Sequence, residues 1–308
     1  MIPRHRLRAF RSGPRACPSP IARHAAEENL SHTAAGETRV ALGRDWLPML
    51  ADLREVGPVL SITRNSHAIL GREGPLPELE RDREGASAGD AGGEFDFEFD
   101  HWGRARAVHA KTAHGHLYSV EWLDAHGAVH HKTCLTSAAD PRQFAGWVAC
   151  HQHSPERPAP PNPSARRGET SAEPGRAIHR GCVDYLLREM ISLAQPVRVI
   201  VGNEASVQGH VFTPTLLRHS DEWCFVSGGQ TGLHLRTRNL AEVLLLETAT
   251  SAGTFAVLKL YEPEGRLAAV IAPPLDADFS QWNAFIDGRI VFQPPTSSRQ
   301  SPNHPFHT

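Results

Sequence analysis

Hydrophobic and polar residues alternate along much of this 308-residue chain, and one such pattern occurs twice. A β-branched apolar run at 197–201 is expected to form one strand that ends at His210, and a similar run at 59–62 continues to Arg72. The two stretches match at a constant difference in residue number (210 − 72), which we call the repeat offset. Further pairs at this offset are Pro58 with Pro196, Asn65 with Asn203, and Gly71 with Gly209. We interpret the chain as a duplicated unit whose halves have diverged in chemistry.

The repeat offset also relates a second pair of segments, 117–127 and 255–265. In each, a strand with period-two alternation leads into an acidic turn with glycine and then into another apolar segment, which is the pattern of a β-hairpin. A repeat of this length indicates a duplicated domain and not a solenoid. We therefore predict that each half is mostly antiparallel sheet.

Other segments predict the remaining elements. Residues 71–92 are charged and rich in glycine, which predicts an exposed loop. The glycine-rich segment 227–232 lies between two strands, so it predicts a hairpin loop and not a phosphate-binding turn. Helices are expected near 19–35, at 45–53 with Asp45 as N-cap, at 140–150 and around 185–193. Further strands are expected at 94–102, 129–135, 223–226, 233–236, 241–247 and 267–271.

Composition divides the chain into five parts. The segment 154–176 is rich in proline, serine and arginine, a composition that buries too little apolar surface to order itself and is typical of a linker. We predict a disordered leader at 1–18, a first repeat at 19–153, the linker at 154–176, a second repeat at 177–291 and a disordered tail at 292–308.

Composition also excludes several classes of function. The net charge is −2 and the pI is near 6.8, so the chain lacks the basic surface of a general nucleic-acid or membrane-surface binder. No apolar run approaches the roughly 18 to 20 residues of a membrane helix, so membrane insertion is not expected. Five cysteines without a C-x-x-C pair argue against a disulfide framework and a zinc knuckle. A reducing cytoplasm is the predicted location.

Histidine supplies most of the candidate chemistry, with 19 in the chain and no nucleophile motif or dinucleotide-binding fingerprint beside them. In the pair His130 and His131, neighbouring strand positions point to opposite faces, which favours a structural role for His131. The segment 150–153 has the sequence Cys-His-Gln-His and contains metal-ligating types, but it adjoins the linker without a set of partners. We expect adventitious metal binding there at most.

Several segments, in order, resemble the HemS/ChuS/PhuS family of bacterial haemin-degrading and haem-trafficking proteins. The matching segments are 60–65, the region of Trp102, 124–135 with His131 and Lys132, 201–203, 208–210, 233–236 and 241–243. This resemblance covers roughly residues 20–290. It implies an α+β fold, a tandem duplication of a large antiparallel β-sheet domain with helices on one side, and two halves joined by a proline-rich linker.

The resemblance also implies a haem site. The family's axial ligand is the histidine after the V-G-N strand, and His210 occupies that position, so His210 is the predicted ligand of haem b iron. The residues themselves suggest a second contact: Arg236 shares a strand face with His234, and its planar guanidinium suits either a haem propionate or, equally, a cross-strand salt bridge.

Three departures from the family favour haem binding over haem breakdown. Phe97 or Glu98 stands where the family has a distal arginine, and Leu70 stands where its first half has a histidine. The basic, glycine-rich segment after the last strand is replaced by 272–276. Should a distal group act here, His101, Arg104 and Arg106 are the nearest candidates.

We therefore expect a cytoplasmic protein of haem uptake that carries haem or presents it for iron release. A haem importer ATPase or a haem oxygenase is the expected partner class. The alternatives are an enzyme of oxidative haem degradation, to which the protein would contribute ligation and water exclusion, and a degenerate homologue that acts as an interaction module.

Overall fold

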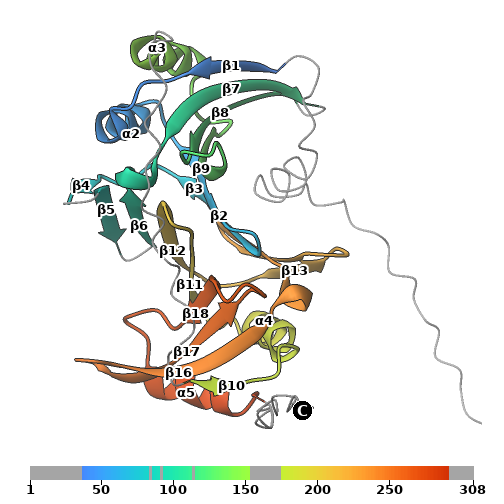
Figure 1. The fold of residues 1–308 in the computed structure, drawn as a ribbon. Coiled ribbons are helices and arrows are strands. Elements are labelled where there is room, and N and C mark those ends of the chain that lie inside the picture. Colours follow the sequence, from blue (N-terminus) through green and yellow to red (C-terminus); the bar gives the residue numbers. More distant parts are fainter. Residues whose placement is uncertain (1–36, 83–84, 91–92, 113–114, 153–174, 291–308) are drawn as a thin grey trace, which may run out of the picture.

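The computed structural model describes residues 37–82, 85–90, 93–112, 115–152 and 175–290, which fold into two nine-stranded antiparallel sheets (Figure 1). The first sheet has, in spatial order, β1 (Thr38–Ala41), β7 (Arg104–Thr112), β8 (Gly115–Leu123), β9 (Val129–Leu135), β2 (Val59–Arg64), β3 (Ala68–Gly74), β15 (Thr231–Leu235), β14 (Cys224–Gly228) and β13 (Leu216–His219). The second has β10 (Arg176–Ala177), β16 (Glu242–Thr250), β17 (Gly253–Tyr261), β18 (Leu267–Ala272), β11 (Val197–Gly202), β12 (Ser206–Phe212), β6 (Gly93–Glu98), β5 (Gly85–Asp90) and β4 (Glu80–Arg81).

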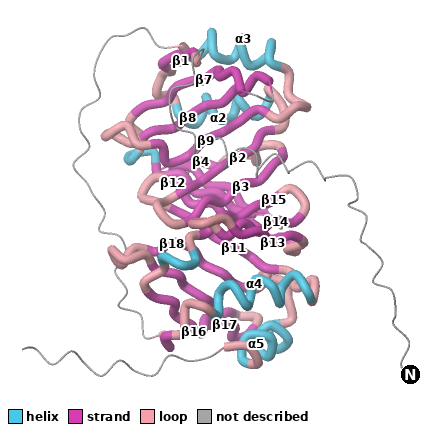
Figure 2. Tube along the Cα trace, turned by 90° about the vertical axis from the view of Figure 1, so that its right-hand side faces the viewer, coloured by secondary structure: helices cyan, strands magenta, loops and turns pink. Residues whose placement is uncertain are grey.

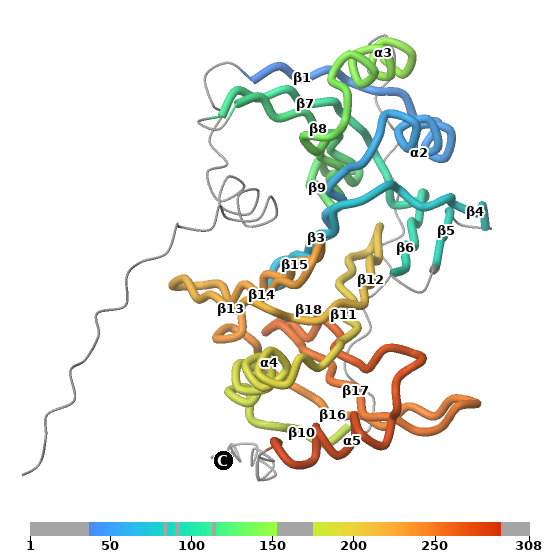
Figure 3. Tube along the Cα trace, turned by 180° about the vertical axis from the view of Figure 1, so that it is seen from behind, coloured from blue at the N-terminus to red at the C-terminus, as the bar shows by residue number. Residues whose placement is uncertain are grey.

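Each sheet takes strands from both halves of the chain. The first sheet ends in β15, β14 and β13 of the second half, and the second sheet ends in β6, β5 and β4 of the first. The exchanged strands extend beside β3 and β12, as the view from behind shows (Figure 3). The repeat offset holds in three dimensions, since the same difference separates the starts of β8 and β17 (253 − 115) and the starts of β2 and β11 (197 − 59).

The described helices, two from each half, lie against the sheets (Figure 2). Helices α2 (Trp46–Glu55) and α3 (Pro141–His151) pack on the first sheet, and α5 (Phe279–Asp287) packs on the second. Helix α4 (Cys182–Ser192) shares its core with strands of the second sheet and also packs against β13 and β14 at the end of the first. The sequence starts α3 sharply because Asp140 accepts a hydrogen bond from the Arg142 amide and proline follows at the first helical position. None of the described helices is long and apolar enough to cross a membrane.

The two halves join where the β2–β3 turn meets the β11–β12 turn. The Asn203 side-chain amide donates to the Arg64 and His130 carbonyl oxygens, both at 2.8 Å. Its oxygen accepts from its own turn, from the backbone N–H groups of residues 205 and 206. Asn65 makes the corresponding contacts from the first half to the second. Its side-chain amide donates to the Gly202 and Ala268 carbonyl oxygens, at 2.9 and 2.8 Å. Each asparagine therefore shapes its own turn and ties it to the other half.

The fold class predicted from the sequence is confirmed, and so are most strands of the two halves. Strand β9 and the loop around Gly229, which has φ of +57°, lie where the sequence pattern predicts them. The leader, residues 154–174 of the predicted linker, the tail and the predicted helix near 19–35 lie outside the described residues, whereas Arg176 at the end of the predicted linker is already in β10.

Four expectations were wrong. The described part of residues 71–92 is not a loop, because β3 continues to Gly74, β4 and β5 form a hairpin, and small residues let β5 lie close to β6. At Gly85, for example, an added Cβ would lie 1.6 Å from the Phe97 carbonyl oxygen. The expected strand at 94–102 ends at 98 and continues as a 3₁₀ turn, and Asp45 makes no side-chain cap to α2. The run ending at His210 is a hairpin of two strands and not one strand.

Replacing Asn203 with alanine should lower the free energy of unfolding by about 2 to 4 kcal/mol, because two carbonyl oxygens and two amide N–H groups lose their partner. Urea unfolding followed by circular dichroism measures the loss. The exposed Asn239 is the matched control, and Asn239→Ala should stay within roughly 0.5 kcal/mol of the parent. Equal effects of the two substitutions would contradict this role.

Candidate functional site

The candidate site centres on His210, in the middle of β12. Across the sheet His210 pairs with Val199 of β11 and with Gly93 of β6. Its side chain is fully buried, with 0% of its surface exposed. Because alternate strand residues share a face, Gln208 lies on the same face, and the Gln208 amide donates to the Ser61 carbonyl oxygen of the first sheet at 3.2 Å. The imidazole therefore lies on the face of the second sheet that packs against the first.

Three neighbours fix the imidazole of His210. The Gln208 side-chain nitrogen lies 2.7 Å from Nε2, and since an amide N–H can only donate, Nε2 accepts that bond. The Phe95 ring meets the imidazole edge to face at 5.4 Å. A Cβ at Gly93 would lie 2.2 Å from Nδ1, so only glycine leaves room for the ring at this register position. The arrangement presents an acceptor nitrogen in an aromatic, buried setting.

The sequence pattern missed Gln208, Phe95 and Gly93 as parts of this site. Two of them, Phe95 and Gly93, come from the first half of the chain and reach His210 only because β6 joins the second sheet. The repeat offset relates equivalent positions, and it carries no information about which strands of opposite halves pair.

The pair His130 and His131 lies where the sheets meet. The Nδ1 atom of His131 lies 2.9 Å from the Thr63 hydroxyl, and its ring packs edge to face on Phe97 at 5.1 Å. The Nδ1 atom of His130 lies 3.0 Å from the Ser206 hydroxyl. Burial lowers the pKa of each histidine to about 3, so both rings are neutral at cellular pH. These contacts agree with a structural role.

Arg236 and His234 stand apart from His210 in the topology. His234 is on β15 and Arg236 directly follows that strand, so both belong to the first sheet, whereas His210 is on the second. The Arg236 guanidinium lies 3.2 Å from a Glu222 carboxylate oxygen and 4.6 Å from the centre of the Trp223 ring. The salt bridge that the sequence left open is thus present. The structure does not bring Arg236 and His210 onto one surface of a sheet.

Two of the remaining candidates, His151 and Arg106, pair with carboxylates away from His210. His151 of the Cys-His-Gln-His segment lies 3.0 Å from an Asp52 carboxylate oxygen, Cys150 is exposed, and His153 is outside the described residues. Among the candidate distal groups, Arg106 pairs with Glu121 at 2.6 Å.

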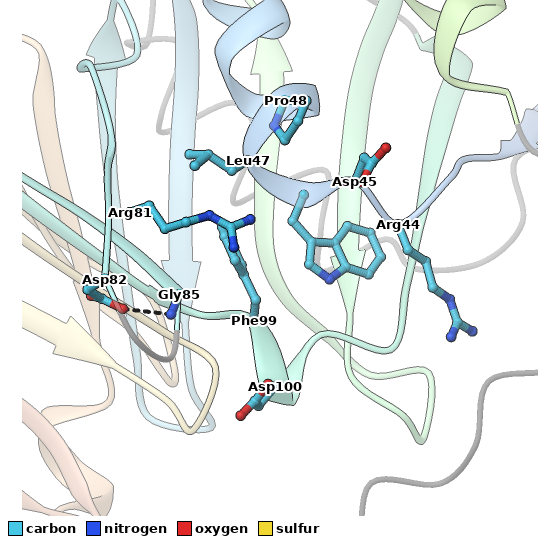
Figure 4. A pocket seen from close by; sticks show the side chains of 10 residues that line it. Arg44, Asp45, Leu47, Pro48, Arg81, Asp82, Gly85, Phe99 and Asp100 are labelled. Atoms are coloured by element: carbon cyan, nitrogen blue, oxygen red, sulfur yellow. Dashed lines mark hydrogen bonds between the residues drawn. The ribbon is translucent and has the colours of Figure 1, made fainter.

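A pocket of about 320 Å³ opens between the start of α2 and the β4–β5 hairpin (Figure 4). Trp46, Arg81 and Phe99 are among its lining residues, together with charged side chains of both signs. Neither His210 nor its neighbours Gln208 and Phe95 line this pocket. The cavity and the histidine are therefore separate features.

Comparison with known proteins places this fold in one group. The family described as the haemin-degrading HemS.ChuX domain matches residues 24–151 and 168–288. The hemin transport protein HmuS of Yersinia pestis is 23% identical over 285 residues, covering 78% of this chain and 81% of the relative.

Two solved structures share the fold at low identity. Holo-PhuS, a heme-binding protein from Pseudomonas aeruginosa, superposes with a TM-score of 0.72 at 20% identity and covers 80% of this chain and 85% of its own. The heme degrading enzyme ChuS of Escherichia coli O157:H7 gives a TM-score of 0.73 at 17% identity, with coverage of 82% and 87%.

Acidification should lower the free energy of unfolding, because the buried histidines stay neutral in the fold but take up protons in the unfolded chain. In the unfolded chain His131 binds a proton below about pH 6.5, whereas in the fold burial holds its pKa near 3. The unfolded state thus binds more protons between these values, and each such histidine costs up to about 1.4 kcal/mol per pH unit as pH falls through that window. Urea unfolding at pH 7.5, 6.5 and 5.5 should show a smaller loss in His131→Gln than in the parent.

The control for this pH series is His126, which is exposed in the turn after β8. His126→Gln should keep the parent's dependence on pH. An identical slope in the parent and His131→Gln would contradict the assignment of a neutral, buried His131.

Proposed function

Because this chain belongs to the family of the haemin-degrading HemS.ChuX domain, we propose that it binds haem for haem uptake and use, with His210 as the iron ligand. The observation that carries the proposal is the asymmetry of the repeat. His210 is a buried imidazole on the inner face of the second sheet, and its counterpart in the first half, one repeat offset earlier, is Arg72. We therefore expect one haem per chain.

The chemistry of the site fits haem. Haem brings an iron that accepts the lone pair of a neutral imidazole nitrogen. Here Nε2 of His210 already acts as an acceptor toward Gln208, so its lone pair is not protonated. Two phenylalanines, Phe95 and Phe97, share this face of the sheet and supply the apolar, aromatic surface that suits a flat, hydrophobic ligand.

Burial of His210 implies that binding opens the protein. The imidazole has no exposed surface, and Phe95 and Gln208 both contact it. Ligation through Nε2 requires the Gln208 amide to leave this nitrogen and the Phe95 ring to move aside. Gln208 also donates to Ser61 of the other sheet, so its release would loosen the contact between the sheets. We expect association that is slower than diffusion allows.

Binding and transport are favoured over oxidative cleavage. The residues of β6 that share a face with His210 include two phenylalanines, and neither ring is a cation that would stabilise charge developing during cleavage. A haem importer ATPase or a haem oxygenase in the cytoplasm is the class of partner that such a carrier would serve. A propionate contact by Arg236 remains a prediction, and it would compete with the Glu222 salt bridge.

Titration of the apoprotein with haemin tests the proposal. The parent should develop a Soret band that saturates near one equivalent. In His210→Ala the band should shift, and affinity should fall by more than the roughly 10- to 100-fold that loss of an outer-shell partner of a metal ligand costs.

The exposed His126 again supplies the matched control, and His126→Ala should keep the parent's band and affinity. An unchanged spectrum and affinity in His210→Ala would refute the ligand assignment. Failure of the parent to form a saturable band would refute haem binding itself and favour an interaction module.

A further inference from the structure

Three metal-ligating side chains converge beside α4, in a part of the second half that takes no share in the His210 site. Asp184 lies in the first turn of α4, His219 ends β13, and Cys224 begins β14. One ligand atom from each lies within 4.8 Å of the other two. We propose that Asp184, His219 and Cys224 form a binding site for a zinc-class divalent transition-metal ion.

The fold positions all three side chains without rearrangement of the backbone. His219 and Cys224 are directly paired across the β13–β14 hairpin, so their side chains lie on the same face of the sheet. Helix α4 packs over that face through the core that contains Cys182, Leu186 and Cys224. A tetrahedral zinc ion with ordinary bond lengths separates its ligand atoms by about 3.3 to 3.6 Å, so closing from 4.8 Å needs side-chain movement of an ångström or so.

The donor types select the class of ion. One thiol sulfur, one imidazole nitrogen and one carboxylate oxygen suit zinc and its neighbours, whereas calcium and magnesium require several oxygen ligands. Asp184 has a buried carboxylate oxygen, Oδ1, without a hydrogen-bond partner among the described residues. A cation would satisfy this oxygen. His219 is exposed, which gives an ion a route from solvent, while Cys224 is buried and shields the sulfur.

A neighbouring positive charge limits which ions Asp184, His219 and Cys224 can bind. The Arg188 guanidinium lies 3.2 Å from Nε2 of His219 and belongs to the same helix as Asp184. Burial raises the pKa of the Cys224 thiol to about 12, so an ion that binds must displace the thiol proton, which leaves to solvent. The resulting thiolate and the Asp184 carboxylate, together with this arginine, give the ligand set a single net negative charge. Such a site favours an ion held by a strong metal–sulfur bond over one held by charge alone.

The repeat provides an internal comparison for this site. The positions one repeat offset earlier are Trp46, Arg81 and Ala86, none of which has metal-ligand chemistry of this kind. Trp46 and Arg81 instead line the 320 Å³ pocket of the first half (Figure 4). The same place in the duplicated fold thus has a pocket in one half and three potential ligands in the other.

Cobalt binding to the untagged, full-length protein tests the proposal. The background variant is Cys150→Ser, which removes the exposed thiol of the Cys-His-Gln-His segment. One equivalent of Co²⁺ should give the near-ultraviolet charge-transfer band of a thiolate–cobalt bond, and Zn²⁺ should displace it. Adding His219→Ala should weaken binding at least roughly tenfold, and Cys224→Ser should abolish the band.

Two controls keep the result interpretable. Cys182→Ser changes a second buried thiol on α4 and should leave the band intact. His219 is exposed, so His219→Ala should fold even if Cys224→Ser does not. No thiolate–cobalt band at one equivalent in Cys150→Ser, or a band whose affinity His219→Ala leaves unchanged, would overturn the proposal. His210→Ala should bind Co²⁺ like the parent, so this outcome is independent of haem binding.

Discussion

The reciprocal hydrogen bonds of Asn65 and Asn203 are the interaction on which the rest of the structure depends. Each side chain organises a tight turn of its own half and holds two backbone carbonyl oxygens of the other. They fix the crossing of β2 and β3 over β11 and β12, and this crossing lets each sheet continue into three strands of the opposite half. The two repeats therefore cannot be separated into two complete sheets.

A duplicated framework of this kind allows the halves to differ in chemistry while they keep the same backbone. The position of His210 is occupied by Arg72 in the first half, and that of Cys224 by Ala86. Because β6 crosses into the second sheet, the first half still contributes Gly93 and Phe95 around His210. The candidate haem site takes its proposed iron ligand from the second half, and the side chains around that ligand come from both halves.

Much of the fold followed from the sequence because period-two alternation and a constant repeat offset are visible along the chain and need no knowledge of which strands pair. Strand β9 and the duplication were predictable for this reason. Strands β4 and β5 were missed because small and charged residues, such as Gly85, conceal their alternation, and the pairing of β5 with β6 is set by close backbone approach. The walls of the site and the convergence of Asp184 with Cys224 depend on pairing between distant segments, which spacing along the chain does not encode.

Resonance Raman spectroscopy of the reduced haem complex tests the central claim most directly, because the iron–histidine stretching band reports the ligand itself. We expect this band in the parent, a shift when the protein's histidines carry ¹⁵N, and its loss in His210→Gly. A band that persists in His210→Gly would contradict the account, since another histidine would then be the ligand and the asymmetry between His210 and Arg72 would have no role in haem binding.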